Sequence, residues 1–317
     1  MPTEVRPDRL GAPYVSTTYE LAPDSEGPVV ATLVHRPAPE RTGRAVLHVH
    51  GFADYFFQTA AAEHWIARGY DFYALDLRKC GRSLLPHQRA HYVADLGEYY
   101  EELDRAWADV TAEHAEVVLS AHSTGGLTGS LWLHDRGHRP AGVFLNAPWL
   151  DMHGPTAVRR LAMPAIGAIG RRLPTREIPR SVSGFYARSL HRDHEGEWDF
   201  DLGLKPVASF PVFAGWMRAI RAGHARVAAG LDVRAPILVE CSARSGHPRS
   251  MADPDVSATD IVLDVEQIRR RAPLLGRHVT TAMIEGALHD VTLSSEPVRK
   301  VVFEELDTFL RAYVEPA

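Results

Sequence analysis

The clearest chemical signal in the sequence is segment 120–126, SAHSTGG. It follows the apolar run 117–119 and leads into a helical pattern, so Ser123 is predicted on a strand-to-helix turn between the small residues Ala121 and Gly125. Such a turn lifts a serine hydroxyl clear of the sheet and leaves no room for large neighbours. The pattern predicts a nucleophilic serine. The structural alternative is a serine that only caps the following helix.

A nucleophilic serine also needs donors for the oxyanion that forms in the reaction. His50, Gly51 and Phe52 follow an apolar run that ends the predicted strand 45–50. In the architecture with this kind of turn, one backbone N–H comes from the loop after that early strand and the other from the residue after the nucleophile. We therefore predict the amides of Phe52 and Thr124 as the oxyanion hole, and expect His50 and Gly51 to bind substrate.

The candidate base lies near the end of the chain. His289 belongs to segment 286–290, GALHD, which follows the predicted strand 278–284. A lone histidine in a loop is usually a surface or capping residue, but the chain order serine, acid, histidine is the one this architecture uses. His289 is thus the predicted general base. His122, beside the nucleophile, is expected to line the substrate site and not to act as a second base.

The elements around these residues predict an α/β protein with a mostly parallel, eight-stranded sheet flanked by helices. Strands are predicted at 14–21, 29–36, 45–50, 71–76, 116–121, 142–147, 235–241 and 278–284, and helices at 59–68, 93–114, 125–136, 265–272 and 297–313. The alternation breaks over 149–234, which predicts an inserted helical cap, or lid, on a core of 1–148 and 235–317. Ligands of open α/β sheets bind at the edge such a cap would cover.

Composition narrows the class of protein. The chain has 317 residues, a net charge of −5 and 45% hydrophobic residues, which is typical of a globular protein and excludes nucleic acid as the expected partner. Its two cysteines, Cys80 and Cys241, are too few for a disulfide framework or a cysteine zinc site. With no apolar run long enough for a secretion signal or a membrane span, we expect a cytoplasmic protein.

Four segments together resemble the α/β-hydrolase superfamily, and within it the lysophospholipase and monoacylglycerol-lipase-like group often labelled serine aminopeptidase S33. They are HVHGF, DLRKCGRS at 76–83, AHSTGG and GALHD. The second resembles the family pattern D-x-x-G-x-G-x-S, but Lys79 and Cys80 replace its usual glycine and histidine. This departure leaves the three catalytic positions intact and implies a changed pocket rim.

The resemblance also implies where the acid lies. The family places it after the strand predicted at 235–241, in a D-x-x-x-(D/P) run before a helix, and residues 260–264, DIVLD, match that run. Asp260 is therefore the expected acid, and Asp264 is expected to cap the next helix. Asp253 and Asp255 lie in the same loop. Asp151 is the main rival, because some hydrolases of this fold carry their acid after the preceding strand.

These residues predict a serine hydrolase that cleaves a carboxylic ester or thioester with an apolar acyl or alcohol part, through an acyl-enzyme and without a cofactor or metal. Its partner would be a small-molecule ester. An acyltransferase, a cyclase or an aminopeptidase could use the same three residues, and a ligand-binding protein could keep the fold without catalysis. The sequence leaves these alternatives open.

The predicted cap carries three weaker signals. The apolar run 161–169 favours packing on the core, with an acyl tunnel or transient contact with a membrane surface as the alternative. The acidic cluster at 193–201 suggests a solvated face, or a pocket for an amine. His191 and His194 are spaced like metal ligands but lie in a charged loop. The cap is also rich in large apolar residues expected to pack on the core or line the site, namely Phe185, Tyr186, Phe210, Phe213, Trp216 and Met217.

Overall fold

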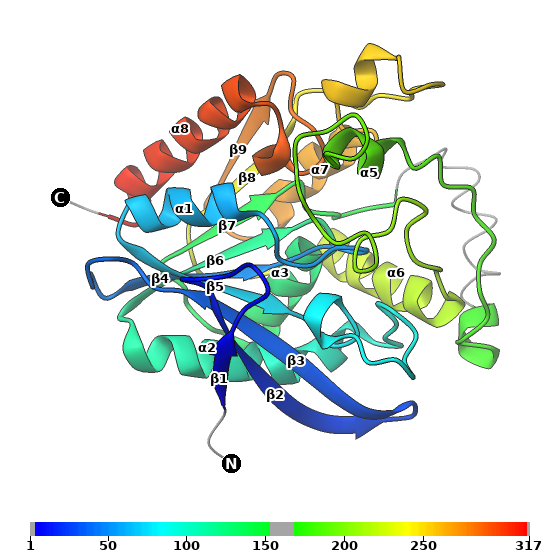
Figure 1. Cartoon of the computed structure of the whole chain (residues 1–317), viewed down its shortest axis with the longest axis horizontal. Helices are drawn as coiled ribbons and strands as arrows, with labels where there is room; N and C mark the ends of the chain where they lie inside the picture. The colour runs from blue at the N-terminus through cyan, green and yellow to red at the C-terminus, as the bar shows by residue number, and fades with distance from the viewer. Residues whose placement is uncertain (1–3, 153–167, 316–317) are drawn as a thin grey trace.

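The computed structural model describes residues 4–152 and 168–315. Within them a sheet of nine strands runs in the order β1-β2-β3-β5-β4-β6-β7-β8-β9 (Figure 1). The strands are β1 (Val5–Pro7), β2 (Val15–Asp24), β3 (Gly27–Arg36), β4 (Arg44–Val49), β5 (Tyr70–Asp76), β6 (Glu116–His122), β7 (Gly142–Asn146), β8 (Ile237–Ser242) and β9 (Val279–Ile284). Pairing is antiparallel from β1 to β5 and parallel from β5 to β9.

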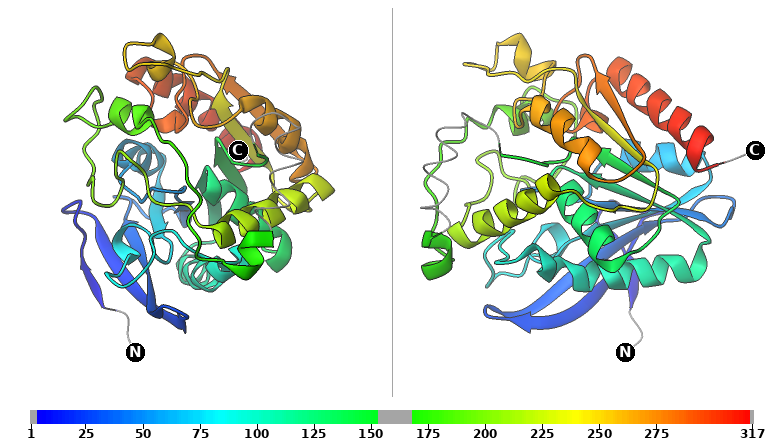
Figure 2. Two further views of the ribbon diagram at one scale, coloured as in Figure 1. Left: turned by 90° about the vertical axis from the view of Figure 1, so that its right-hand side faces the viewer. Right: turned by 180° about the vertical axis from the view of Figure 1, so that it is seen from behind.

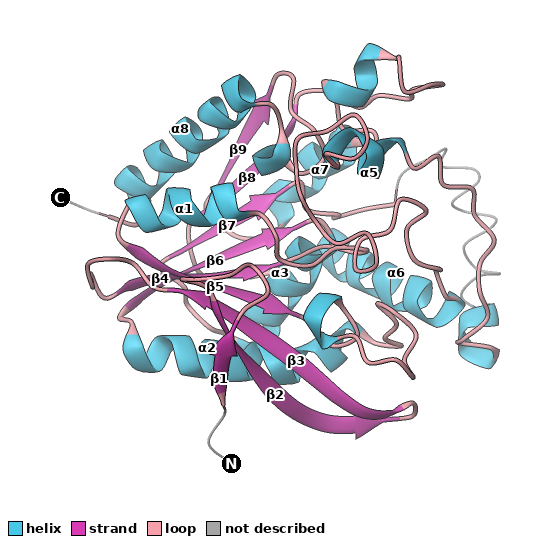
Figure 3. Ribbon diagram, viewed as in Figure 1, coloured by secondary structure: helices cyan, strands magenta, loops and turns pink. Residues whose placement is uncertain are grey.

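Helices cover both faces of the sheet, as the alternation of strands and helices predicts (Figures 2 and 3). Side chains of α1 (Thr59–Ala67) and α8 (Glu296–Tyr313) share one core with Val46 of β4. Those of α2 (Tyr100–Glu113), α3 (Thr124–Arg136) and α7 (Val265–Arg271) share the other with Leu47. Adjacent residues of β4 thus face opposite layers, because successive side chains of a strand point to opposite sides.

Two details differ from the prediction. The eight predicted strands correspond to β2–β9, and β1 is a ninth, unpredicted strand. It has three exposed residues, too few for an alternating pattern, and is held by pairing with β2. The helix predicted from 93 begins later, with a short 3₁₀ turn at Leu96–Tyr99 that leads into α2. Asp95 caps this turn by accepting a hydrogen bond from the Gly97 amide.

The segment between β7 and β8 lies beyond the carboxyl ends of the parallel strands (Figure 1). Its described part holds α5 (Phe185–Leu190), α6 (Ala214–Ala229) and a helical stretch at 168–172. Irregular chain occupies most of 191–213, so the described segment is less helical than predicted. Of the apolar run at 161–169, residues 161–167 lie outside the described residues. Across the described ranges, no helix combines the length and the apolar character needed to cross a membrane.

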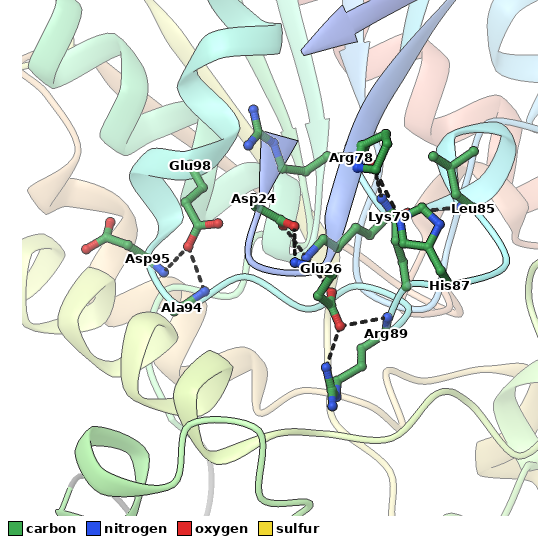
Figure 4. A network of polar contacts seen from close by, with 12 residues as sticks. Asp24, Glu26, Arg78, Lys79, Leu85, His87, Arg89, Ala94, Asp95 and Glu98 are labelled. Carbon is green, nitrogen blue, oxygen red and sulfur yellow. Dashed lines mark hydrogen bonds and ion pairs between the residues drawn. The ribbon is translucent and has the colours of Figure 1, made fainter. Parts of the chain in front are cut away.

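Lys79 shows how the chain tolerates its departure from the family pattern. Its φ of 60° lies in the left-handed region that favours glycine, the residue expected there. The buried Lys79 ammonium lies 2.5 Å from Asp24 and 2.6 Å from Glu26, at the end of the β2–β3 hairpin (Figure 4). The neighbouring Cys80 is buried, and burial raises the pKa of its thiol. The side chain at position 79 therefore offsets backbone strain with two ion pairs.

Two substitutions separate the effect of the ion pairs of Lys79 on stability from the effect of the strained backbone. Lys79→Ala removes both ion pairs and keeps a Cβ at positive φ, whereas Lys79→Gly removes the same pairs and relieves the backbone. We expect both variants to be less stable than the wild type, because the partly buried Asp24 loses its ion pair and Glu26 keeps only the pair with Arg89. The glycine variant should be the more stable of the two by about 1 kcal/mol. Urea unfolding measures the three free energies, and wild-type stability in Lys79→Ala would contradict this account.

Candidate active site

Ser123 lies at a strained turn between β6 and α3. Its φ is 50° and its ψ is −115°, a conformation that residues other than glycine rarely adopt. A Cβ at Gly125 would lie 2.4 Å from the carbonyl oxygen of His50, and one at Gly126 would lie 2.7 Å from Cβ of Pro148. Only glycine fits at these two positions. Ser123 does occupy the N-cap position of α3, but its side chain makes no capping hydrogen bond.

The Ser123 hydroxyl instead lies within hydrogen-bonding distance of His289. Its Oγ lies 3.0 Å from His289 Nε2, and His289 Nδ1 lies 2.9 Å from Asp260 Oδ2. Because a carboxylate only accepts, the Nδ1 proton points to Asp260 and Nε2 is free to accept the serine proton. All three residues are buried, with exposed fractions of 7% for Ser123, 3% for His289 and 0% for Asp260. The structure thus brings together the serine, histidine and acid predicted from the sequence.

Asp260 is fixed by the backbone of its own loop. Its Oδ1 accepts hydrogen bonds from the amides of Val262 at 2.8 Å and Leu263 at 2.7 Å, which leaves Oδ2 for His289. The other acidic candidates bind other groups: Asp151 binds Arg271, Asp264 caps α7 through the Glu266 amide, Asp253 accepts from the Asp255 amide, and Asp255 binds Arg244. Asp260, and not Asp151, is the acid in contact with His289.

The predicted oxyanion donors border the same site. Phe52 and Thr124 line one cavity with Ser123, and Thr124 is the first residue of α3, where helix amides carry partial positive charge. His50 holds the loop before Phe52 by donating from Nδ1 to the Gly51 carbonyl at 2.7 Å and accepting from the Leu77 amide at 3.1 Å. Both ring nitrogens of His50 therefore bind the backbone.

A cavity of about 480 Å³ opens beside Ser123 and His289. Its described lining comes from the loops after β4, β6, β7 and β8 and from the inserted segment: Phe52, Ala53, His122, Thr124, Trp149, Met152, Ile178, Arg180, Ser181, Val182, Ser183, Gly184, Tyr186, Ala187, Lys205, Pro206, Val207, Ser209, Val212, Trp216, Met217, Ile261, Val262 and Leu263. The predicted substrate-binding residue His122 is in this lining. His50 and Gly51 border a smaller neighbouring cavity instead, and their binding role stays a prediction.

The inserted segment supplies much of this wall. Tyr186, Trp216 and Met217 line it, whereas Phe210 packs on His91 and Phe213 on Tyr92. Arg180 and Lys205 line it as well, and neither was predicted from the sequence. Neither belongs to a motif, and a basic residue in an irregular insertion carries no signal of the cavity it faces.

The comparisons with known proteins fit this geometry. The family model described as serine aminopeptidase S33 matches residues 40–239, more than half of the chain. The chain belongs to this family of α/β-hydrolases. The matched span includes Ser123 and ends before Asp260 and His289.

Solved structures share the fold of this S33 family member at low sequence identity. The soluble variant of monoglyceride lipase from Saccharomyces cerevisiae, in complex with a substrate analog, has a TM-score of 0.66 and 15% identity over 93% of this chain and 94% of its own. The monoacylglycerol lipase of Paleococcus ferrophilus has a TM-score of 0.63 and 18% identity over 87% of this chain and 98% of its own. Comparison with curated proteins found no significant match.

A buried polar network lies next to His289 in this family member. Asp54 accepts from Lys205 Nζ at 2.9 Å, and Gln58 Nε2 lies 3.4 Å from Asp54 and 3.3 Å from Asp290. Asp54, His122 and Asp290 each offer a ligand atom within 4.8 Å of the others. Donors of the chain itself already compensate both carboxylates, so the group is explained without a metal ion. Burial lowers the pKa of His122, which favours its neutral form.

The weaker candidates of the inserted segment have other partners. His191 lies 2.9 Å from the Phe200 carbonyl through Nε2 and accepts from the Asp193 amide at 3.1 Å through Nδ1, so both its ring nitrogens are occupied. Four acids of the cluster at 193–201 form ion pairs with arginines, namely Arg188, Arg299, Arg192 and Arg9. None of these acids belongs to the described lining of the cavity.

The Asp54–Lys205 pair gives a pH-dependent prediction. Burial alone would raise the pKa of Asp54. Several neighbouring charges lower it, of which Lys205 has the largest effect, and the pKa of Asp54 lies well below its usual range. Since an unfolded aspartate has a pKa of about 3.9, Asp54 stabilises the fold above that pH, and this contribution is lost as the pH falls through the folded pKa. Removing Lys205 leaves an uncompensated buried charge.

Lys205→Met should lower the free energy of unfolding by about 3–5 kcal/mol at pH 7. The deficit should shrink as the pH falls from neutral towards pH 4, because burial without Lys205 raises the pKa of Asp54 in the variant and a protonated Asp54 needs no charged partner. The double variant Asp54→Asn with Lys205→Met should recover part of the loss at pH 7. Urea unfolding at several pH values tests this, and a deficit that is constant with pH would contradict it.

Proposed function

We propose that this protein is a serine hydrolase that cleaves a carboxylic ester or thioester with an apolar acyl or alcohol part. The proposal rests on two hydrogen bonds, one between Ser123 Oγ and His289 and one between His289 and Asp260. Ser123 and His289 line the cavity of about 480 Å³. A buried serine beside an oriented histidine is the arrangement that nucleophilic catalysis needs.

Acylation begins when Ser123 Oγ attacks the substrate carbonyl carbon and His289 Nε2 takes the hydroxyl proton. The carbonyl oxygen becomes an oxyanion, which accepts hydrogen bonds from the amides of Phe52 and Thr124. Each such donor typically stabilises the transition state by about 3–4 kcal/mol. The intermediate then collapses, the bond to the alcohol or thiol breaks, and His289 returns the proton to that leaving group.

Deacylation repeats these steps with water as the nucleophile. His289 takes a proton from the water, and the water oxygen attacks the acyl carbon. His289 then returns the proton to Ser123 Oγ as the acid product leaves. In both halves Asp260 holds the histidine tautomer and stabilises the imidazolium. The reaction needs no cofactor, since every proton and bond is accounted for by these residues, water and the substrate.

The cavity supports an apolar substrate. Trp149, Val212, Trp216 and Leu263 are among its lining residues, and a pocket of a few hundred Å³ with mostly apolar walls is typical of small-molecule sites. We propose that segment 149–234 acts as the cap of this site, because it supplies so much of the wall. The solved monoacylglycerol and monoglyceride lipases share the fold, which is consistent with an ester substrate.

Substitution of the nucleophile tests the proposal most directly. Ser123→Ala should lower kcat by up to about 10⁶-fold, the loss typical when a serine nucleophile is removed. A fluorophosphonate should add one adduct to the wild type and none to this variant, as read by intact-protein mass. Ser120→Ala is the matched control: Ser120 lies in the same segment but bonds His48, so labelling should persist. An adduct on Ser123→Ala would overturn the assignment.

A series of nitrophenyl esters tests the apolar part of the proposal. Each buried methylene contributes about 0.8 kcal/mol, which corresponds to about a fourfold gain in kcat/KM per methylene until the cavity is full. We therefore expect kcat/KM to rise from the acetyl towards the octanoyl ester. A flat response would show that the apolar side chains of the inserted segment serve packing and not substrate binding.

A further inference from the structure

The cavity wall is charged with one sign only. Among its described lining residues, the ionised side chains are Arg180 and Lys205, and no aspartate or glutamate is present. Residues 153–167, which the structure does not describe, contain no aspartate or glutamate in the sequence. In the described lining, a ligand therefore meets two basic side chains and no acidic one.

Lys205 does not provide that charge to a ligand. It is buried, and its ammonium forms the ion pair with Asp54 at 2.9 Å. The same ammonium lies 5.7 Å from the ring centre of Phe57 and 5.8 Å from that of Tyr186. Its charge is compensated within the protein, so Lys205 holds the inserted segment on the loop after β4.

Arg180 differs in having no acidic partner. Its Nη2 donates to Ser209 Oγ at 2.8 Å and to the Phe210 carbonyl at 2.6 Å, both neutral acceptors. No carboxylate of the described residues lies within 4.0 Å of the Arg180 guanidinium, the distance within which an ion pair forms. Arg180 is an exposed residue, so its guanidinium is accessible to solvent and to a ligand that enters the cavity.

The position of Arg180 places its charge near the proposed chemistry. Its guanidinium carbon lies 5.6 Å from the ring centre of Phe52, the residue whose amide is the proposed oxyanion donor. Both residues line the cavity with Ser123. The two hydrogen bonds of Nη2 anchor the guanidinium, while Nε and Nη1 make no hydrogen bond to the residues that the structure describes. A fixed guanidinium with free donors suits the planar oxygens of a carboxylate or phosphate.

We propose that Arg180 binds an anionic group, a carboxylate or a phosphodiester, that the ester substrate carries away from its scissile bond. This inference rests on the proposed function and names a substrate class for it. The same charge disfavours a substrate with a free amino terminus, since such an amine would meet Arg180 and no acid. The apolar wall would hold the rest of the substrate, and Arg180 would fix its orientation.

Matched pairs of esters test the proposal. One pair compares nitrophenyl esters of ω-carboxy acids with uncharged acyl esters of equal length, over a series of chain lengths. The other compares octanoyl lysophosphatidylglycerol with 1-octanoylglycerol, which lacks the phosphodiester. In the wild type we expect kcat/KM for the charged member of one pair to exceed that of its neutral partner by about ten- to a hundredfold, and the responding pair distinguishes carboxylate from phosphodiester.

Substitutions assign the preference to Arg180. Arg180→Gln should abolish the charged-to-neutral ratio chiefly through KM, and Arg180→Lys should retain part of it, because the charge stays but the forked geometry is lost. Arg188→Gln is the control: it removes an arginine of α5 that pairs with Glu195 and is not among the described lining, so the ratio should not change. Thermal unfolding checks that each variant is folded.

Two results would overturn the inference while the proposed function stands: equal kcat/KM for charged and neutral members of both pairs, or a ratio that survives in Arg180→Gln. Failure of the proposed function looks different. In that case the wild type cleaves neither the charged nor the neutral esters, and the fluorophosphonate does not label Ser123.

Discussion

The close approach of α3 to the end of β4 is the constraint on which the site depends. β4 and β6 are parallel neighbours, so the loops that follow them meet at one edge of the sheet. Contact is so tight that a Cβ at Gly125 would lie 2.4 Å from the carbonyl oxygen of His50. The chain can make that approach only by turning sharply at Ser123, and the positive φ there is part of the turn. The same contact brings the amides of Phe52 and Thr124 to one cavity with the serine hydroxyl.

The histidine is held from two sides. Asp260 binds its ring, and the next residue, Asp290, is fixed by Asn146 at the end of β7, whose Nδ2 donates to Asp290 Oδ1 at 2.6 Å. Asn146 Oδ1 in turn accepts from the Val291 amide at 3.0 Å. Gln58 extends this network to the carboxylates of Asp290 and Asp54. The loops after β4, β7 and β9 are thus joined beneath the site, and a buried network that is fully bonded restricts the positions of its members.

The residues that could be predicted from the sequence are those whose role depends on the types of their neighbours in the chain. The turn at Ser123 needs small neighbours within three positions, and the strands around it are continuous apolar runs, so both could be located without a structure. Asp260 needed the family resemblance, because several acids follow β8 and only folding decides which one meets His289. β1 was missed since three exposed residues carry no pattern. Arg180 and Lys205 could not be found, since their partners lie up to 151 positions away in the chain.

The core and the inserted segment differ in the charges that they place at the cavity. The reacting groups are uncharged or paired within the protein, because a buried charge without a partner costs several kcal/mol. Lys205 obeys this rule through Asp54, and the pair also fixes the insertion to the core. Arg180 is exposed and has no carboxylate partner among the described residues, so the proposed anionic ligand would supply one. An aminopeptidase, the activity in the description of this family, would need negative charge to bind an amine, and the described lining of this cavity carries the opposite sign. In the function proposed above, the core supplies the reacting groups and the inserted segment selects the charge of the substrate.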